Sequence, residues 1–514
     1  MDGRLVGLPE TGAATARTTT RPGVGVDMDD REHASGGART DGGGGTDDAV
    51  AATITERADA YRDRLFDLLA QPSVSTTGEG MDVAPGLVVD VLADAGLDAE
   101  RIETERYPLV YAERGPVGGA GDVAGAGDDA PTVLFYGHYD VQPPGDVDAW
   151  ESPAFEPTVR DGSIYARGAG DNKGQFAAHA FAVDALLSAD AFPDVTVKLL
   201  VEGGEESGSA GLREYLRSQP DALADVDLVY VADGPRHAVA GENGVRAGVP
   251  TLMYGNRGVL SVQVDLRTAN TDLHSGNFGG PIPGATNRLV ELLASMRADD
   301  GDGVAVDGFH DGTAITDADR ELVAAIPDDS DAIRRELDVD RLATADPYYE
   351  RLLTRPTMTI NGLSGGYQGE GMKTVLPARA SAKLDFRLVP NQDPDAVFEA
   401  VRSHLREREP RVEVAKHGTF PPMKTPVDTP MAVPVRESLA TVWDEDVVEL
   451  PVLGGSLPAA YFREVEALAD VPVLVVPYAN HDQGNHSPNE HLDVDCFENG
   501  IRTSARVIRS LGSH

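Results

Sequence analysis

The chain has 514 residues, too many for one ordinary hydrophobic core, so we expect at least two domains. Its 44 Lys and Arg against 85 Asp and Glu give a net charge of 44 − 85 = −41, which argues against nucleic acid and anionic membrane as partners. Cys496 is the only cysteine, which excludes an internal disulfide and a cysteine-based zinc site, and no apolar run is long enough for a membrane span or signal peptide. We therefore expect a soluble, cytoplasmic protein.

The basic residues are strongly biased towards arginine. Six of the 44 are lysines, which leaves 38 arginines. An acidic surface with little lysine suits high salt, because screening relieves the repulsion among carboxylates. The composition therefore predicts a halophilic protein.

The N-terminal part begins with a segment that cannot form a core. Residues 1–47 contain almost no large apolar side chains and are predicted to be a disordered tail. Apolar residues at helical spacing then predict a helix over 48–71, ended by Pro72, and a second helix over Ala84–Ala95. The stretch Ala99–Glu113 is expected to be extended, and the Gly- and Asp-rich stretch Gly115–Ala130 to be a mobile loop.

Strands and helices then alternate along the chain. We expect strands at Thr132–Tyr136, Val195–Val201, Val226–Ala232 and Val471–Val476, and a helix at Phe176–Leu187. This order predicts a mainly parallel α/β sheet, which binds ligands at the carboxyl ends of its strands. We assign residues 48–249 and 425–514 to this catalytic domain.

Residues 250–424 have a different pattern. In Gly258–Thr268, apolar residues alternate with polar ones, and Ser381–Leu388 alternates in the same way. Helical patterns cover Pro283–Met296 and Asp395–Arg406. We therefore predict a smaller α/β domain with an antiparallel sheet, inserted into the main domain.

Polar residues with metal-binding chemistry follow the strands of the main domain. They are His138, Asp140, Asp171, Glu205, Glu206, Asp233 and His486. Each has an ordinary alternative: Glu205 and Glu206 could form a solvated acidic loop, and Asp171 could cap the following helix. Four segments nevertheless place His, Asp or Glu just past the carboxyl end of a strand. That recurrence predicts one shared site.

The chemistry of this set favours two metal ions. Five residues could be ligands, namely His138, Asp171, Glu206, Asp233 and His486, and Asp140 could orient the ring of His138. Nitrogen and oxygen ligands without sulfur suit zinc, manganese or cobalt, and five ligands fit two ions that share a bridging carboxylate. Such a pair can hold a water between the ions and lower its pKa. The spare Glu205 could then act as the general base.

Five motifs in order resemble those of the M20 metallopeptidases. They are G-H-Y-D at 137–140, R-G-A-G-D-N-K-G at 167–174, E-G-G-E-E-S-G-S at 202–209, Asp233-Gly234 and the loop around His486. The resemblance extends from about Asp48 to the C-terminus. It implies a di-metal catalytic domain with an inserted lid, or dimerisation, domain.

The resemblance also implies roles for the site residues. His138 and Asp233 would hold one metal, Glu206 and His486 the other, and Asp171 would bridge them. Glu205 would be the general base, and Asp140 would orient His138. The peptide bond between Asp171 and Asn172 would be cis.

The inserted segment carries further motifs of this family. L-H-S-G at 273–276 implies that His274 enters the active site of a partner subunit, and hence a homodimer. K-T-V-L-P, F-R-L-V-P and G-G-S-L-P make Thr374, Arg387 and Ser456 candidates for substrate binding, and Arg387 could grip a terminal carboxylate. Related sequences often carry an arginine just before G-G-S, where this chain has Val452 and Leu453.

The resulting hypothesis is hydrolysis of dipeptides or short peptides with two divalent ions, zinc first and manganese or cobalt as alternatives. The alternative within the family is a deacylase of N-acyl amino acids, which would use the same metals. Dinucleotide binding at Gly168–Gly170 and Gly174 has the wrong glycine spacing. A metal-binding protein without catalysis would lack the base, and Glu205 is present.

Overall fold

The computed structural model describes residues 44–116, 130–241, 244–298 and 303–513. The predicted tail lies outside these residues except for 44–47, which belong to helix α1 (Gly44–Ala70) and not to a tail. The predicted loop at 115–130 also lies mostly outside them. No helix in the described ranges is long and apolar enough to cross a membrane.

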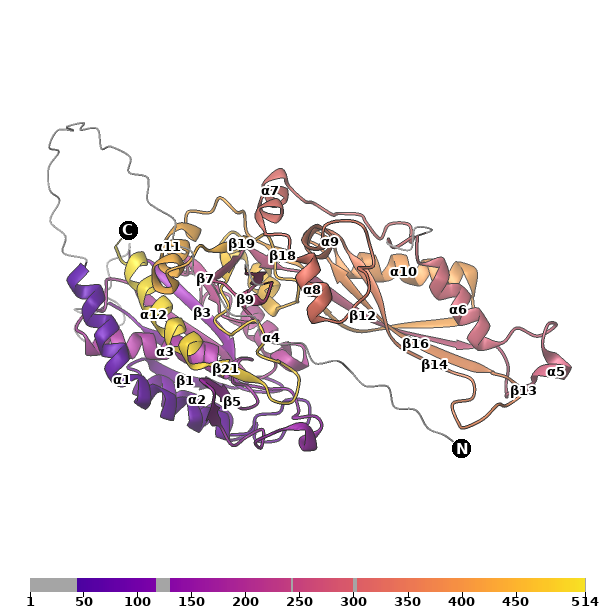
Figure 1. Cartoon of the computed structure of the whole chain (residues 1–514), viewed down its shortest axis with the longest axis horizontal. Coiled ribbons are helices and arrows are strands. Elements are labelled where there is room, and N and C mark those ends of the chain that lie inside the picture. The colour runs from indigo at the N-terminus through magenta and orange to yellow at the C-terminus, as the bar shows by residue number, and fades with distance from the viewer. Residues whose placement is uncertain (1–43, 117–129, 242–243, 299–302, 514) are drawn as a thin grey trace, which may run out of the picture. The chain divides into compact units, whose positions relative to one another are not determined.

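An eight-stranded sheet forms the centre of the main part of the chain (Figure 1). Its strand order is β1-β2-β6-β3-β7-β20-β10-β19. In that order the strands are β1 (Asp98–Ile102), β2 (Leu109–Arg114), β6 (Thr196–Glu202), β3 (Thr132–His138), β7 (Leu228–Val231), β20 (Val473–Val475), β10 (Thr251–Met253) and β19 (Val448–Leu450). The neighbours β6, β3, β7 and β20 are parallel, whereas β2 and β10 join this centre in antiparallel pairs. The expected mainly parallel sheet is confirmed, but the stretch from 99 to 113 is a β-hairpin rather than one extended segment.

The central strands are buried on both faces because apolar residues fill most of their positions. Val133 and Phe135 of β3 belong to one hydrophobic cluster, and Leu134 and Tyr136 belong to a second one. Consecutive side chains of a strand point to opposite faces, so each cluster covers one face of the sheet. A continuous apolar run at the sequence level thus becomes a strand between two helical layers.

Helices from both ends of the chain cover the first face. They are α1, α2 (Ala84–Asp94), α3 (Lys173–Ser188), α11 (Ala432–Trp443) and α12 (Val494–Leu511). Helix α12 packs against α3 and α11, as Figure 1 shows. The opposite face is covered by α4 (Ala210–Ser218), α7 (Asp317–Ala325), α8 (Ser330–Glu336) and α9 (Tyr348–Thr354).

A separate four-stranded antiparallel sheet is built from residues 258–420. Its order is β14 (Thr357–Gly365), β16 (Arg379–Leu388), β12 (Gly258–Arg267) and β17 (Val412–Phe420). The apolar residues of β12 pack under α6 (Ala285–Ser295) and α10 (Pro394–Arg408) in a hydrophobic cluster of their own. The alternation of apolar and polar residues in the sequence correctly predicted the strands β12 and β16, but it did not predict β14 or β17. The domain boundaries at 249/250 and 424/425 stay a prediction.

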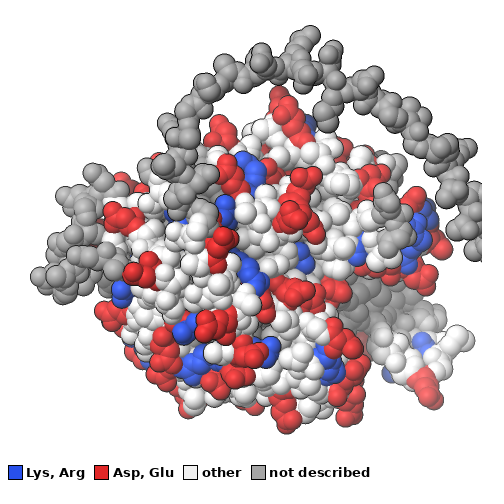
Figure 2. Space-filling view, turned by 60° about the vertical axis from the view of Figure 1, so that its left-hand side comes forward, with Lys and Arg blue, Asp and Glu red and all other residues white. Residues whose placement is uncertain are grey.

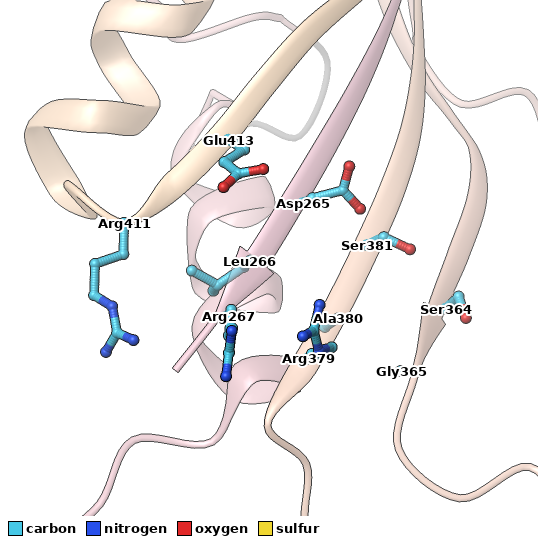
Figure 3. Close-up of a pocket in the computed structure, with 10 residues that line it drawn as sticks. All are labelled: Asp265, Leu266, Arg267, Ser364, Gly365, Arg379, Ala380, Ser381, Arg411 and Glu413. Carbon is cyan, nitrogen blue, oxygen red and sulfur yellow. The ribbon is translucent and has the colours of Figure 1, made fainter. Parts of the chain in front are cut away.

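The other face of this smaller sheet is polar and charged (Figure 3). Arg267 and Arg379 lie directly opposite each other on β12 and β16, with Arg411 beside them, and Asp265 pairs with Glu413 in the neighbouring row. These side chains line a hollow of about 350 Å³. A sheet with one apolar and one polar face is typical of antiparallel strands that are covered on one side only.

Short strand pairs complete the fold. They are β4 (Thr158–Arg160) and β21 (His491–Asp493) on either side of β5 (Ser163–Tyr165), β8 (Ala238–Ala240) with β9 (Arg246–Gly248), β11 (Gly255–Asn256) with β18 (Met423–Lys424), and β13 (Leu273–His274) with β15 (Val375–Leu376). The short helix α5 (Ser275–Phe278) follows β13. The β5–β21 pair matters for function, since it joins the segment before α3 to the segment after His486.

Candidate metal centre

The last residue of β3 begins the site. His138 is fully buried, and its Nδ1 lies 3.0 Å from the backbone oxygen of Asp140 and 3.4 Å from the Asp140 carboxylate. The Asp140 carboxylate also accepts hydrogen bonds from the backbone N–H groups of Glu205 and Glu206, each at 3.1 Å. Asp140 therefore fixes the position of the glutamate loop as well as lying beside the His138 ring.

The structure brings the five predicted ligands together in two groups of three. The groups are His138, Asp171 and Asp233, and Asp171, Glu206 and His486, with the potential ligand atoms of each group within 4.8 Å of one another. Asp171 belongs to both: its Oδ1 lies 3.1 Å from His138 Nε2 and its Oδ2 lies 3.2 Å from His486 Nε2. His486 Nε2 is also 3.3 Å from Glu206 Oε1. The two oxygens of one carboxylate thus face two separate donor groups.

Asp171 is held in place by its own loop. The Asp171–Asn172 peptide is cis, as the family resemblance implied. Asn172 occupies the N-cap position of α3, and the Asp171 carboxylate bonds to histidines instead of capping the helix. The side chain of Asn172 accepts a hydrogen bond from the N–H of His138 and donates one to the carbonyl of Ala232. It thereby links the ends of β3 and β7 to this loop.

The electrostatics of the site reflect its crowded carboxylates. Burial and the nearby charge of Asp171 raise the pKa of Asp233 to about 7. Burial also raises the pKa of Glu205 well above its usual value, and the charges of Asp233 and Glu206 add to the effect. Hydrogen bonds to Asp171 and Glu206 raise the pKa of His486 to about 10. These acidic groups lie close enough to repel one another once they are ionised.

The donor set fits divalent cations. Among the described residues, the carboxylates of Asp171, Glu206 and Asp233 form no ion pair with Lys or Arg. Their ion-pair partners are the histidines His138 and His486. Two histidines cannot balance three buried carboxylates, and a divalent metal would supply the missing positive charge. Imidazole and carboxylate ligands without sulfur suit zinc, manganese or cobalt.

Glu205 lies next to the two ligand groups without belonging to either. It begins a single 3-10 turn, Glu205–Ser207, after Gly203 and Gly204. A Cβ at Gly203 would lie 2.1 Å from the hydroxyl of Tyr139, so a side chain at this position would clash with the tyrosine ring. The role of Glu205 as the base stays a prediction.

The three predicted substrate residues and the predicted catalytic residue His274 fall into two pairs. Arg387 donates from Nη1 to the Ser456 hydroxyl at 3.1 Å. The ring of His274, which is exposed, lies 3.5 Å from the Thr374 hydroxyl. In the described part of the chain, neither His274 nor Thr374 forms a hydrogen bond or ion pair with the five candidate ligands.

Sequence reasoning missed the residues that support the metal ligands. Glu490 is fully buried, accepts hydrogen bonds from the N–H groups of Gly168, Gly170 and Asp171, and receives another from Arg167 at 2.6 Å. Gln175 bonds to the carbonyls of Gly170 and Gly234. A glutamate four residues after His486 could have been noted, but nothing in the sequence indicated its partners some 320 residues away.

Comparison with known proteins identifies the family. The family model described as "Peptidase family M20/M25/M40" matches residues 134–510, well over half of the chain. The chain belongs to this peptidase family. It is therefore a metallopeptidase, and the resemblance noted in the sequence is confirmed.

Individual relatives agree with this membership. The Beta-Ala-His dipeptidase of Rattus norvegicus is 30% identical over 393 residues, covering 74% of this chain and 77% of its own length. The Cys-Gly metallodipeptidase dug1 of Schizosaccharomyces pombe is 28% identical over 398 residues, 74% of this chain and 80% of that protein. Among solved structures, the M20 family metallo-carboxypeptidase Sso-CP2 from Sulfolobus solfataricus matches with a TM-score of 0.78 and 31% identity, covering 88% of this chain and 99% of that one.

Proposed function

We propose that this metallopeptidase hydrolyses the peptide bond of dipeptides and short peptides. The observation that carries the proposal is the pair of ligand groups that share Asp171, with Glu205 beside them. The names of the relatives support a dipeptidase rather than a deacylase of N-acyl amino acids. We infer two divalent ions, with zinc first and manganese or cobalt as alternatives.

The candidate ligands would hold the ions as two sets around a common carboxylate. His138 and Asp233 would hold one ion, Glu206 and His486 would hold the other, and Asp171 would contribute to both sets. When bound, such ions polarise a carbonyl oxygen and lower the pKa of a water molecule. Asp140 keeps the His138 ring in one orientation and holds the Glu205–Glu206 backbone in register with it.

Glu205 moves the proton. Its carboxylate accepts a proton from the attacking water and delivers it to the nitrogen of the leaving amine, so the C–N bond breaks while a C–O bond forms. Arg387 and Ser456 bind the C-terminal carboxylate of the peptide, since a guanidinium and a hydroxyl both donate to such a group. Thr374 contributes a further polar contact.

We infer that the enzyme acts as a homodimer. His274, the last residue of β13, and Thr374, which directly precedes β15, are exposed and lie 3.5 Å apart, and in the described residues neither bonds to the candidate ligands of its own chain. A second copy would bring His274 to the scissile carbonyl of its neighbour. We further propose that the protein is cytoplasmic and adapted to high salt, because its composition is acidic and poor in lysine.

The test is a substrate panel in molar salt with zinc, manganese or cobalt added to chelator-treated enzyme. Dipeptides should be cleaved at least about tenfold more efficiently than N-acetyl and N-succinyl amino acids, which is a difference of about 1.4 kcal/mol in barrier. Cleavage of the N-acyl substrates alone would favour the deacylase. Inactivity on both classes with every metal would contradict the proposal.

A further inference from the structure

The carboxylate of Glu206 is divided between two partners from distant segments. Its Oε1 lies 3.3 Å from Nε2 of His486, in the ligand group that also contains Asp171. Its Oε2 accepts a hydrogen bond of 2.8 Å from the side-chain amide of Gln142. The Glu206 side chain is 4% exposed, so water has little access to either oxygen. The direction of this carboxylate is therefore set in part by a residue that is not a candidate ligand.

The neighbouring glutamate lacks such a contact. The backbone N–H groups of Glu205 and Glu206 bond alike to the Asp140 carboxylate. No described residue, however, donates a hydrogen bond to the Glu205 side chain, whereas Gln142 donates one to that of Glu206. Of the two glutamates, the one that Gln142 contacts is the one that belongs to a ligand group.

Gln142 is held on both sides along its own chain. The N–H of Val141 donates to the carbonyl of Ser73 at 2.9 Å, and the carbonyl of Pro143 accepts a hydrogen bond of 3.1 Å from Arg167. A residue that precedes proline is also restricted to extended backbone conformations. The amide of Gln142 therefore reaches the glutamate loop from a backbone that is itself fixed.

A neutral amide suits this position better than a cation. An ionised carboxylate only accepts hydrogen bonds, so the amide nitrogen of Gln142 must face it. A lysine or arginine would also neutralise the carboxylate and would compete with a divalent ion for it. Glutamine instead orients Glu206 and leaves its negative charge available to a metal. Hydrogen bonds of this kind to ligating carboxylates are typical of metal sites.

We propose that Gln142 is a positioning residue for the metal ion that Glu206 and His486 would bind. By holding Oε2, its amide turns Oε1 of Glu206 towards His486. It thereby selects Glu206 over Glu205 as the ligand. This rests on the proposed function, in which that ligand group holds one of two ions. Loss of an outer hydrogen bond of this kind typically weakens metal binding by about 10–100-fold.

The experiment measures zinc binding to chelator-treated protein by competition with a chromophoric chelator, at one pH and one molar salt concentration. Gln142→Leu has a similar size but no donor. In this variant one of the two ions should bind about 10–100-fold more weakly, and the other should bind as in the wild type.

Gln71→Leu is the matched control. Gln71 is also partly buried and also donates a hydrogen bond of 2.8 Å, but to the carbonyl of Pro72. This variant should bind both ions as the wild type does. A selective loss of one ion in Gln71→Leu as well would overturn the proposal.

Two results with Gln142→Leu would also overturn the proposal. One is an unchanged affinity for both ions. The other is an equal loss for both, because a general structural defect does not distinguish the two ligand groups. Gln142→Asn covers the case in which a melting curve shows that leucine disturbs folding, since asparagine cannot overpack and is one methylene too short for the hydrogen bond. The same selective loss is expected, and binding of both ions as in the wild type would contradict the assigned role.

A double-mutant cycle shows whether Gln142 acts through Glu206. Adding Gln142→Leu to Glu206→Ala should cause little further loss of affinity for the affected ion, because the carboxylate that Gln142 holds is already absent. Additive losses would overturn the proposal. All these measurements are made without substrate. If the enzyme cleaves no dipeptide but the selective loss is found, the dipeptidase function fails and the role of Gln142 stands.

Discussion

At the scale of single residues, Glu205 and Glu206 are chemically identical neighbours with different surroundings. Glu206 lies in a ligand group with Asp171 and His486, whereas Glu205 belongs to no such group. The backbone N–H groups of both residues donate hydrogen bonds to the same Asp140 carboxylate. A difference in role between them would therefore come from the direction of their side chains alone.

This difference can be tested by changing one glutamate at a time. Glu205→Gln should keep both metals and bind substrate but lose about 10²–10⁴-fold in kcat, the size of a general-base contribution. Glu206→Gln should instead lose affinity for one metal, and excess metal should partly restore its activity. Elemental analysis beside kinetics distinguishes the two. Loss of a metal in Glu205→Gln with both retained in Glu206→Gln would reverse our assignment.

Metal removal should affect stability in a pH-dependent way. In the metal-free protein Asp233 has a pKa of about 7 and His486 one of about 10, so both hold protons near neutral pH. A metal must displace these protons, and they become easier to remove as the pH rises. The stabilisation by metal should therefore grow from about pH 6 to about pH 8.

The measurement is the melting temperature of the metal-loaded enzyme minus that of the chelator-treated enzyme at each pH, in constant salt. Subtracting the two melting temperatures cancels the effect of groups that titrate in the same way with and without metal. A difference that is constant or shrinks as the pH rises would show that these ligands do not bind the metal as proposed.

At the scale of elements, one buried ion pair fastens the loop before α3 to the segment before β21. Arg167 and Glu490 are each about 1% exposed in their side chains and lie 2.6 Å apart. Glu490→Gln leaves the Arg167 charge buried without its partner and weakens three hydrogen bonds from backbone N–H groups. We expect the free energy of unfolding to fall by about 3–5 kcal/mol.

Denaturant unfolding in constant salt measures this loss. Glu498→Gln is the matched control, since Glu498 pairs with Arg502 at 2.9 Å on the partly exposed side of α12. A partly exposed ion pair of this kind contributes about 0–1 kcal/mol to the free energy of unfolding. If Glu490→Gln is no more destabilised than the control, the ion pair does not hold the loop.

At the scale of the whole molecule, the proposed homodimer can be tested by mixing two inactive variants. His274→Ala and Glu205→Gln proteins should each be inactive, because each lacks one residue of every active site. In a hybrid dimer with a shared site, one of the two sites would regain both residues. After full exchange half of the dimers are hybrids, so a mixture should recover about a quarter of the wild-type activity.

Recovery should be measured after subunit exchange has been confirmed with a labelled copy. The control is a mixture of His274→Ala with a second inactive variant of His274. Every subunit in that mixture lacks His274, so no hybrid dimer contains an intact site. Exchange without recovery would exclude the shared site.

Salt should govern the stability of the whole molecule. Acidic side chains spread over the face shown in Figure 2, with basic groups scattered among them. At low ionic strength the repulsion within a net charge of −41 opposes the compact state, and salt screens it. The melting temperature should rise by about 5–10 °C between low and molar salt. A curve that is flat or falls with sodium chloride would contradict salt adaptation.

The sequence by itself determined the α/β class, the parallel centre of the main sheet and which candidate ligand residues cluster. Local patterns were enough for this, because a buried parallel strand is a continuous apolar run and its candidate ligands lie at its carboxyl end, as His138 does in β3. The alternation in β12 likewise identified its buried face. The order of five motifs then indicated the family.

Only the tertiary structure decided how these parts are supported and what surrounds them. Glu490 reaches the Asp171 loop, and Arg257 meets Arg387, through contacts between residues more than a hundred positions apart. Neither residue carries a local signal, because hydrogen-bond partners and burial depend on the packing of distant segments. The strands β14 and β17 also escaped prediction, since partly exposed edge strands lack the strong apolar pattern of central ones.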